Sequence, residues 1–168
     1  NPYKTDKLFE FITDVGRTYT QGKGLDFECI IEDGVPTVLR GDEKRIKQVV
    51  IRLIANSVRY TREGGVTLRV DFEKVEPLRG ILKIIVSDTG IGMKEDELNA
   101  LRARIGHMKN PDTGHITGVN LGITAAAGVI FAINGTFDIA GSYMRGTDVT
   151  FTLEQEIVST SVLKPKDK

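Results

Sequence analysis

The sequence predicts an α+β fold, a two-layer α/β sandwich in which a mixed, mostly antiparallel sheet carries its helices on one face. Three segments show apolar side chains at helical spacing, over residues 5–19, 42–60 and 118–133. Between them lie short β-branched runs joined by turns that contain glycine or proline, a pattern typical of paired strands. With 168 residues, 40% of them hydrophobic, the chain can bury one core.

The N-terminal third is predicted to form a helix, a strand and a second helix. The apolar side of the first helix consists of Leu8, Phe9, Phe11, Ile12 and Val15. A strand follows at residues 25–31, and a short edge pairing is expected at 38–39 after Pro36. Asp42 is placed to cap the second helix, which we expect to end near Thr61 because two glycines follow.

The remaining chain is predicted to add four strands and two helices. We expect strands at 66–73, 81–87, 136–140 and 147–153, the last two as a hairpin, and helices at 94–104 and 118–133. Residues 105–118 lack periodicity and are expected to form a mobile loop. We therefore expect one domain at residues 1–155 and a polar C-terminal tail at 156–168, with fraying from residue 154.

Composition argues against several classes of partner. The 23 basic residues are matched by 23 acidic ones, which argues against a surface that neutralises nucleic-acid phosphates. No apolar run is long enough to cross a bilayer, so we expect no membrane contact by this fragment. The lone Cys29 favours a reducing, cytoplasmic location. The start at Asn1, without a signal-type apolar core, indicates a piece of a longer protein and leaves open a membrane-anchored parent.

Residues 88–93, with the sequence DTGIGM, are the strongest candidate for a ligand site. Asp88 follows an apolar, β-branched strand, and Gly90 and Gly92 let the backbone approach a ligand closely. A carboxylate and a two-glycine turn at the end of a buried strand indicate a nucleotide pocket. The alternative is an ordinary turn, which Asp-Thr-Gly sequences also form.

The second helix places a polar stripe beside its apolar face. At about 100° per residue, four residues fall on one side of it: Arg45, Arg52, Asn56 and Arg59. The Asn56 carbonyl oxygen suits a hard cation such as magnesium, and arginines one turn away suit phosphate oxygens. The alternative is a solvated helix side whose arginines cover the edge of the core.

Three motifs together resemble the ATP-binding catalytic domain of sensor histidine kinases, in the GHKL or Bergerat-fold ATPase superfamily. They lie at residues 41–61, 88–93 and 118–123, in matching order and spacing. With the closing strands the resemblance covers roughly residues 5–155. It implies a Bergerat-type fold that binds ATP and Mg²⁺ and transfers the γ-phosphoryl group to a histidine on a separate dimerisation and phosphoacceptor module. A response regulator would act downstream.

The resemblance also implies roles for individual residues, although it leaves the catalytic residues unknown. Asn56 matches the magnesium-binding asparagine, and Asp88 would accept a hydrogen bond from the adenine amino group. The start of the helix near residue 118 would present backbone N–H groups to the phosphates, and residues 94–117 would be the ATP lid. The other implied nucleotide-binding residues are Arg59, Tyr60, Gly90, Gly92, Gly118, Leu121, Gly122 and Thr147.

Three departures from the family pattern bear on activity. The family usually has asparagine at position 52, where this chain has Arg52, which either crowds the metal or supplies an extra phosphate contact. Asn120 replaces the middle glycine of a Gly-x-Gly-x-Gly run. A phenylalanine-containing segment that normally precedes the lid is missing, and its loose substitutes are Leu101, Ile105 and Met108.

Three functions therefore stay open. The first is the kinase domain described above, and the second is a degenerate nucleotide-binding or non-catalytic regulatory module of the same fold. The third, ATP hydrolysis of the gyrase type, needs a glutamate general base one turn before Asn56, where the chain has Arg52. His107 and His115 lack the sequence context of an acceptor, so we expect the acceptor histidine on another module.

Overall fold

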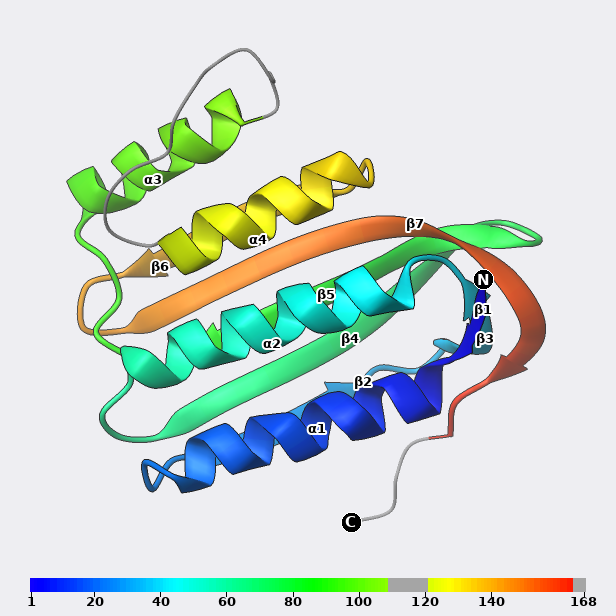
Figure 1. The fold of residues 1–168 in the computed structure, drawn as a ribbon, viewed down its shortest axis with the longest axis horizontal. Coiled ribbons are helices and arrows are strands. Elements are labelled where there is room, and N and C mark those ends of the chain that lie inside the picture. The colour runs from blue at the N-terminus through cyan, green and yellow to red at the C-terminus, as the bar shows by residue number, and fades with distance from the viewer. Residues whose placement is uncertain (109–120, 165–168) are drawn as a thin grey trace.

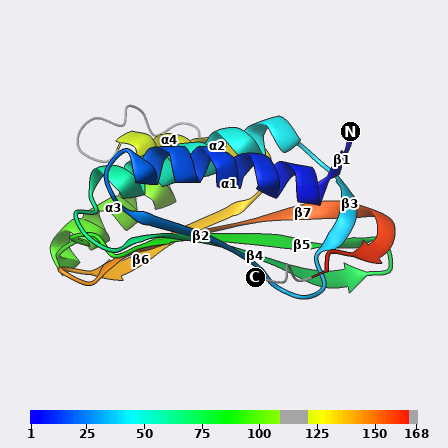
Figure 2. The same cartoon turned by 90° about the horizontal axis from the view of Figure 1, so that it is seen from below.

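The computed structural model describes residues 1–108 and 121–164, which form two layers (Figures 1 and 2). Three helices lie side by side on one face of the sheet, and a fourth packs beside the last hairpin. Their bounds are α1 Thr5–Gln21, α2 Glu43–Arg59, α3 Glu95–His107 and α4 Leu121–Ala132. The predicted helices are confirmed within a few residues, although the expected positions 118–120 lie outside the described residues.

The sheet is mixed and mostly antiparallel, as predicted. Among the described residues its strand order is β1-β3-β7-β5-β4-β2, and β6 pairs with the first half of β7 while β3 pairs with its second half. The pair β2–β4 is parallel and the other pairs are antiparallel. The strands are β1 Pro2–Lys4, β2 Asp26–Ile31, β3 Pro36–Arg40, β4 Gly65–Glu76, β5 Arg79–Asp88, β6 Thr136–Ser142 and β7 Gly146–Val162.

The core lies between α2 and the middle of the sheet. The period of the α2 sequence puts Ile46, Val50 and Leu53 on its buried face. The facing strands alternate, so that Ile84 of β5 is buried and Lys83 beside it is exposed on the opposite face. This burial fixes the register of the strand that carries Asp88 and the rotation of the helix that carries the polar stripe.

The C-terminal strand continues beyond its predicted end. Residues 154–162 were expected to fray, with a tail from residue 156, but β7 extends to Val162 and its second half pairs with β3. Alternation explains the difference, because Leu153, Gln155 and Ile157 face the core while the residues between them are exposed. The pairing at 38–39 is likewise internal, since β3 lies between β7 and β1.

The first strand, β1, was not predicted, because three residues are too few to show alternation. Its buried Tyr3 donates a hydrogen bond from its hydroxyl to Gln155 Oε1 at 2.8 Å, which ties the first strand to the last. Burial, together with the nearby Glu43 carboxylate, raises the pKa of Tyr3 well above its ordinary value. The hydroxyl therefore stays protonated and acts as a structural donor.

The expectation of a mobile loop at residues 105–118 is wrong for its first residues. Residues 105–107 belong to α3, because Leu98, Leu101 and Ile105 form a buried side on that helix. Arg102 Nε also donates to the Ile139 carbonyl of β6 at 2.9 Å. Residues 109–118 lie outside the described part of the chain. In the part that is described, no helix is long and apolar enough to span a membrane.

Candidate functional site

Asp88 ends β5, a central strand whose neighbours in the sheet are β4 and β7. Its Oδ1 atom accepts hydrogen bonds from the backbone N–H of Gly90 at 2.9 Å and of Thr147 at 3.2 Å. The first bond closes the turn that follows the strand, and the second joins that turn to β7. Two backbone donors therefore hold the carboxylate in one orientation.

Burial raises the pKa of Asp88 above its ordinary value, because a charged carboxylate loses solvation there. Hydrogen bonds from Gly90, Ser57 and Thr147 act in the opposite direction, and the nearby Asp148 carboxylate raises the pKa further. Ser57 lies on the last turn of α2 and is buried. Sequence reasoning did not assign it to the site, although a small polar residue within the apolar face of α2 was the available signal.

The turn after Asp88 packs against the turn between β6 and β7. Gly92 and Gly146 have positive φ angles of 67° and 100°, which favour glycine. A Cβ at Gly92 would collide with the Ser142 carbonyl oxygen, and one at Gly146 would collide with the Asp88 carbonyl oxygen. Both glycines are therefore required by close approach of the backbones, and the approach of Gly92 to a ligand stays a prediction.

The other side of the same turn rests on the end of α2. Ile91 N–H donates to the Tyr60 carbonyl at 3.2 Å, and a Cβ at Gly90 would lie 2.6 Å from that oxygen. Thr61 is fully buried and donates from Oγ1 to the Ser57 carbonyl at 2.7 Å. The structure thus brings Tyr60, Gly90 and Gly92 together around Asp88, and it adds Thr61 as a supporting residue.

The polar side of α2 meets the start of α4. A Cβ at Gly122 would lie 3.7 Å from Asn56 Oδ1, so the amide of Asn56 faces the first turn of α4. Asn56 is half-buried, and its side chain makes no hydrogen bond within residues 1–108 and 121–164. Leu121 is the first residue of α4, and Gly118 lies outside the described residues. An amide oxygen and a helix N-terminus are therefore adjacent, an arrangement that suits a cation and an anion bound together.

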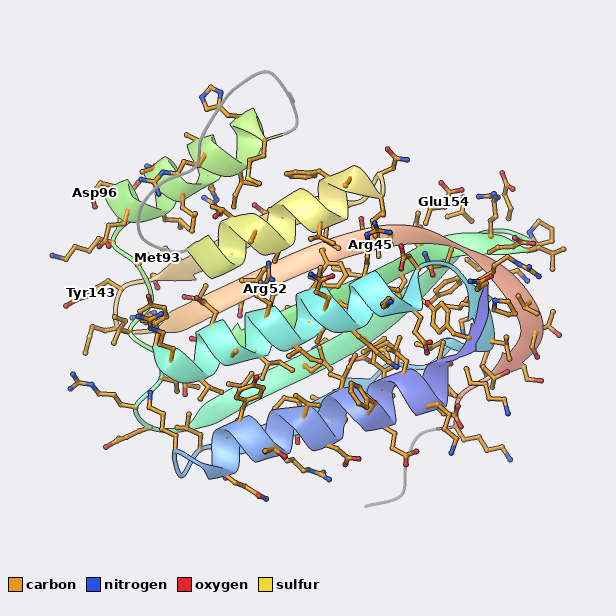
Figure 3. All side chains as sticks on the ribbon, viewed as in Figure 1. Arg45, Arg52, Met93, Asp96, Tyr143 and Glu154 are labelled. Carbon is orange, nitrogen blue, oxygen red and sulfur yellow. The ribbon has the colours of Figure 1, made fainter. Side chains whose placement is uncertain are left out.

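The three arginines of the stripe differ in their surroundings. Arg45 donates to the carboxylate of Asp42, whose pKa the Arg45 hydrogen bond lowers. Arg59 is exposed, with its Cζ 5.6 Å from the centroid of the Tyr60 ring. Arg52 is half-buried and extends from α2 toward α4 (Figure 3). The interpretation as a solvated helix side whose arginines cover the core edge fits Arg45, and for Arg52 that interpretation and a phosphate contact both stay predictions.

The side chains near Asn56 suit a magnesium ion only when a bound phosphate-bearing ligand supplies further oxygen ligands. Within the described chain no group of three histidine, cysteine or acidic side chains is placed to hold a metal. Asn56 offers one amide oxygen without a hydrogen-bond partner among the described residues. Mg²⁺ prefers six oxygen ligands and commonly takes several of them from water and substrate phosphates. The residues present therefore fit a magnesium ion that arrives with a phosphate-bearing ligand.

Comparison with known proteins assigns most of the chain to one family. The sequence profile of the family described as histidine kinase-, DNA gyrase B-, and HSP90-like ATPase matches residues 41–157. Hybrid signal transduction histidine kinase B of Dictyostelium discoideum is 29% identical over 139 residues, covering 83% of this chain and 7% of that protein. Autoinducer 2 sensor kinase/phosphatase LuxQ of Vibrio cholerae is 26% identical over 160 residues, covering 94% of this chain and 18% of that protein.

The fold is also similar to that of solved histidine kinases. Full-length ShkA in complex with AMPPNP superposes with a TM-score of 0.73 and 21% identity, covering 95% of this chain and 32% of that one. The chain thus spans a minor part of these relatives. The matched range 41–157 includes α2, the turn at residues 88–93 and the start of α4. This chain belongs to the histidine kinase-, DNA gyrase B-, and HSP90-like ATPase family, within which it resembles the ATP-binding catalytic domains of sensor histidine kinases.

Proposed function

We propose that this domain binds ATP with Mg²⁺ and transfers the γ-phosphoryl group to a histidine on a separate dimerisation and phosphoacceptor module. The observation that carries the proposal is the fixed Asp88 carboxylate, which two backbone N–H groups orient at the end of β5. A buried carboxylate can accept a hydrogen bond from the exocyclic amine of adenine. Family membership supports the same ligand.

The base and the phosphates would occupy opposite ends of one site. Adenine would lie against Asp88, Gly90, Gly92 and Thr147, and the phosphates would lie at the start of α4 near Asn56 and Gly122. Arg59 and Tyr60, at the end of α2, would border the nucleotide. Gly118 and Leu121 would contribute backbone at the phosphate end, and residues 94–117 would act as the lid.

Phosphoryl transfer suits this set of residues better than hydrolysis does. A phosphoryl group passes to its acceptor through positioning and charge compensation, so the chain need not supply a covalent intermediate. Asn56 would hold Mg²⁺, which neutralises phosphate charge when it is bound. One turn earlier the helix carries Arg52, which cannot deprotonate a water molecule.

The partners follow from this chemistry. The acceptor histidine would lie on the same or a partner chain, and a response regulator would then receive the phosphoryl group. The relatives named above support this proposal, since their printed names describe hybrid and sensor kinases. We place the domain in the cytoplasm, whether or not its parent protein is anchored in a membrane. We propose that the fragment itself contacts neither nucleic acid nor membrane.

A degenerate, non-catalytic nucleotide-binding module is the second candidate, and Arg52 is the observation that favours it. To separate the two, the domain is incubated with ATP labelled on the γ-phosphate and the phosphoacceptor module of its parent protein. We expect label on a module histidine, and much less label at the same ATP concentration when Asp88→Asn replaces the wild-type domain. Calorimetric binding of ATP without transfer would favour the degenerate module. Phosphate release without acceptor would favour the gyrase-type ATPase.

A further inference from the structure

Arg52 is half-buried, and its side chain has no counterion among residues 1–108 and 121–164. The ion pairs in that part of the chain involve other side chains, and the Arg52 guanidinium donates no hydrogen bond there. Removing a guanidinium from water carries a free-energy cost that a bound anion offsets. Arg45, two turns earlier on the same side of α2, has such an anion in Asp42.

The surroundings of Arg52 identify which anion it can meet. Arg52 lies four residues before Asn56, about 6 Å along the helix axis, and its side chain extends toward α4 (Figure 3). The Asn56 amide faces Gly122 in the first turn of α4. The guanidinium therefore lies on the side of α2 that faces α4, one helical turn from the Asn56 amide at the start of α4, and both the guanidinium and a helix N-terminus attract phosphate oxygens.

We propose, building on the function proposed above, that Arg52 contacts the phosphates of the bound nucleotide and supplies positive charge that Mg²⁺ would otherwise have to bring. Nucleotide binding by this chain then depends less on Mg²⁺ than it does with asparagine at position 52. A fixed guanidinium interacts with the phosphates and not with the base. Its contribution therefore grows with the number of phosphate groups and is absent for adenosine.

The test is a calorimetric titration of adenylyl imidodiphosphate with excess Mg²⁺ and, separately, with EDTA. The proteins are the wild type, Arg52→Asn, Arg52→Lys and the control Arg45→Asn, each checked for folding by circular dichroism. A charge-assisted hydrogen bond corresponds to about tenfold to hundredfold in affinity. We expect Arg52→Asn to lose about that much affinity in EDTA and less with Mg²⁺. The ratio of the dissociation constant in EDTA to that with Mg²⁺ then rises severalfold, by the loss in EDTA divided by the smaller loss with Mg²⁺.

The other proteins and ligands sharpen the result. Arg52→Lys should keep part of the metal-free affinity because it keeps the charge, and Arg45→Asn should behave as the wild type. Adenosine should bind the wild type and Arg52→Asn equally. An unchanged ratio in Arg52→Asn would overturn the proposal. The proposal would also be overturned if Arg52→Asn bound the analogue more tightly than the wild type with Mg²⁺ and equally well in EDTA. That result would mean that Arg52 crowds the metal.

The two proposals fail in distinguishable ways. If the wild type binds neither adenosine nor the nucleotide analogue, the function proposed above is wrong and this inference falls with it. If the wild type binds the analogue but the ratio does not respond to position 52, only the role of Arg52 is wrong. A loss of adenosine binding in a folded Arg52→Asn variant would also overturn the inference, because a phosphate contact does not act on the base.

Discussion

The two ends of the candidate site are built in different ways. At the Asp88 end, backbone groups from β5, β7 and the end of α2 contact one another closely. Where the two turns meet, only glycine fits at the positions of Gly92 and Gly146. At the Asn56 end, two half-buried polar side chains of α2, Arg52 and Asn56, lack hydrogen-bond partners among the described residues. The first end is complete without a ligand, and the second still has unused hydrogen-bonding capacity.

Under the proposed function, this contrast separates recognition of the adenine base at the Asp88 end from compensation of the phosphate charge at the Asn56 end. A carboxylate held by two N–H groups pays its ordering cost during folding, so it can recognise a base without reorganising. Side chains without partners gain their interactions only when a ligand arrives. We therefore expect substitutions at the Asp88 end to change both stability and binding. Substitutions at the Asn56 end should change binding while stability stays nearly constant.

The largest effect is expected from Gly92→Ala, which attacks the packed end directly. The new Cβ collides with the Ser142 carbonyl at a backbone position with positive φ, so we expect a loss of more than about 2 kcal/mol in unfolding free energy. Urea unfolding measures the loss. The matched control is Gly106→Ala, where a Cβ on α3 meets nothing within 4 Å. This control should be neutral or stabilising by up to about 1 kcal/mol. Equal stability of the two variants would contradict the description of the Asp88 end.

Asp88→Asn should lower nucleotide affinity by about tenfold to hundredfold, because the amide oxygen is a weaker acceptor for the adenine amine. Calorimetry with adenylyl imidodiphosphate measures the change, and Asp148→Asn on the exposed part of β7 is the control. The asparagine oxygen can still accept from Gly90 and Thr147, so the turn should remain closed. Identical affinities for the wild type and Asp88→Asn would remove Asp88 from the site.

Asp88→Asn is also expected to change how the unfolding free energy depends on pH. The pKa of Asp88 is raised in the folded protein, so its contribution to stability is fully present below the ordinary value of 3.8 and is lost as the pH rises through the folded value. Asp88→Asn removes this dependence. The unfolding free energy of the variant relative to the wild type should therefore increase from acid to neutral pH. A relative stability that decreases over this range would show that the carboxylate is favoured by folding in its charged form.

The smallest effect on stability is expected from Asn56→Ala, which tests the other end. The Asn56 side chain makes no hydrogen bond among the described residues, so the unfolding free energy should change by less than about 0.5 kcal/mol. Nucleotide affinity measured with Mg²⁺ should still fall by about tenfold, and affinity in EDTA should change little. Gln48→Ala, on the exposed side of the same helix, controls for helix propensity. A large loss of stability in Asn56→Ala would show that this end, too, is packed before the ligand binds.

How far the sequence predicted the molecule depended on the length of each pattern. The period of α2 extends over five turns, and it correctly placed both the core residues and the polar stripe. β1 has three residues and was missed. The second half of β7 was assigned to a tail because its outward residues are polar, although Gln155 and Ile157 alternate inward. A buried polar residue such as Gln155 breaks the apolar alternation that identifies a strand.

The candidate site was predictable where a motif is continuous in sequence and less so where contacts come from distant segments. Asp88, Gly90 and Gly92 were identified from one turn. Ser57 supports the carboxylate from α2; its position within the apolar face of α2 was a local signal, but it does not identify a partner 31 positions along the chain. The separate environments of Arg45 and Arg52 were equally hidden, because the helical period gives them the same direction.

One unbroken strand, β7, has a mechanical consequence. Near its start, Thr147 donates to the Asp88 carboxylate, and eight residues later Gln155 accepts from Tyr3 in the first strand. A continuous segment of β7 backbone, about 26 Å long, therefore connects these two hydrogen bonds. Force applied at β1 therefore reaches the carboxylate through one side-chain hydrogen bond, from Tyr3 to Gln155, and then along the backbone of β7.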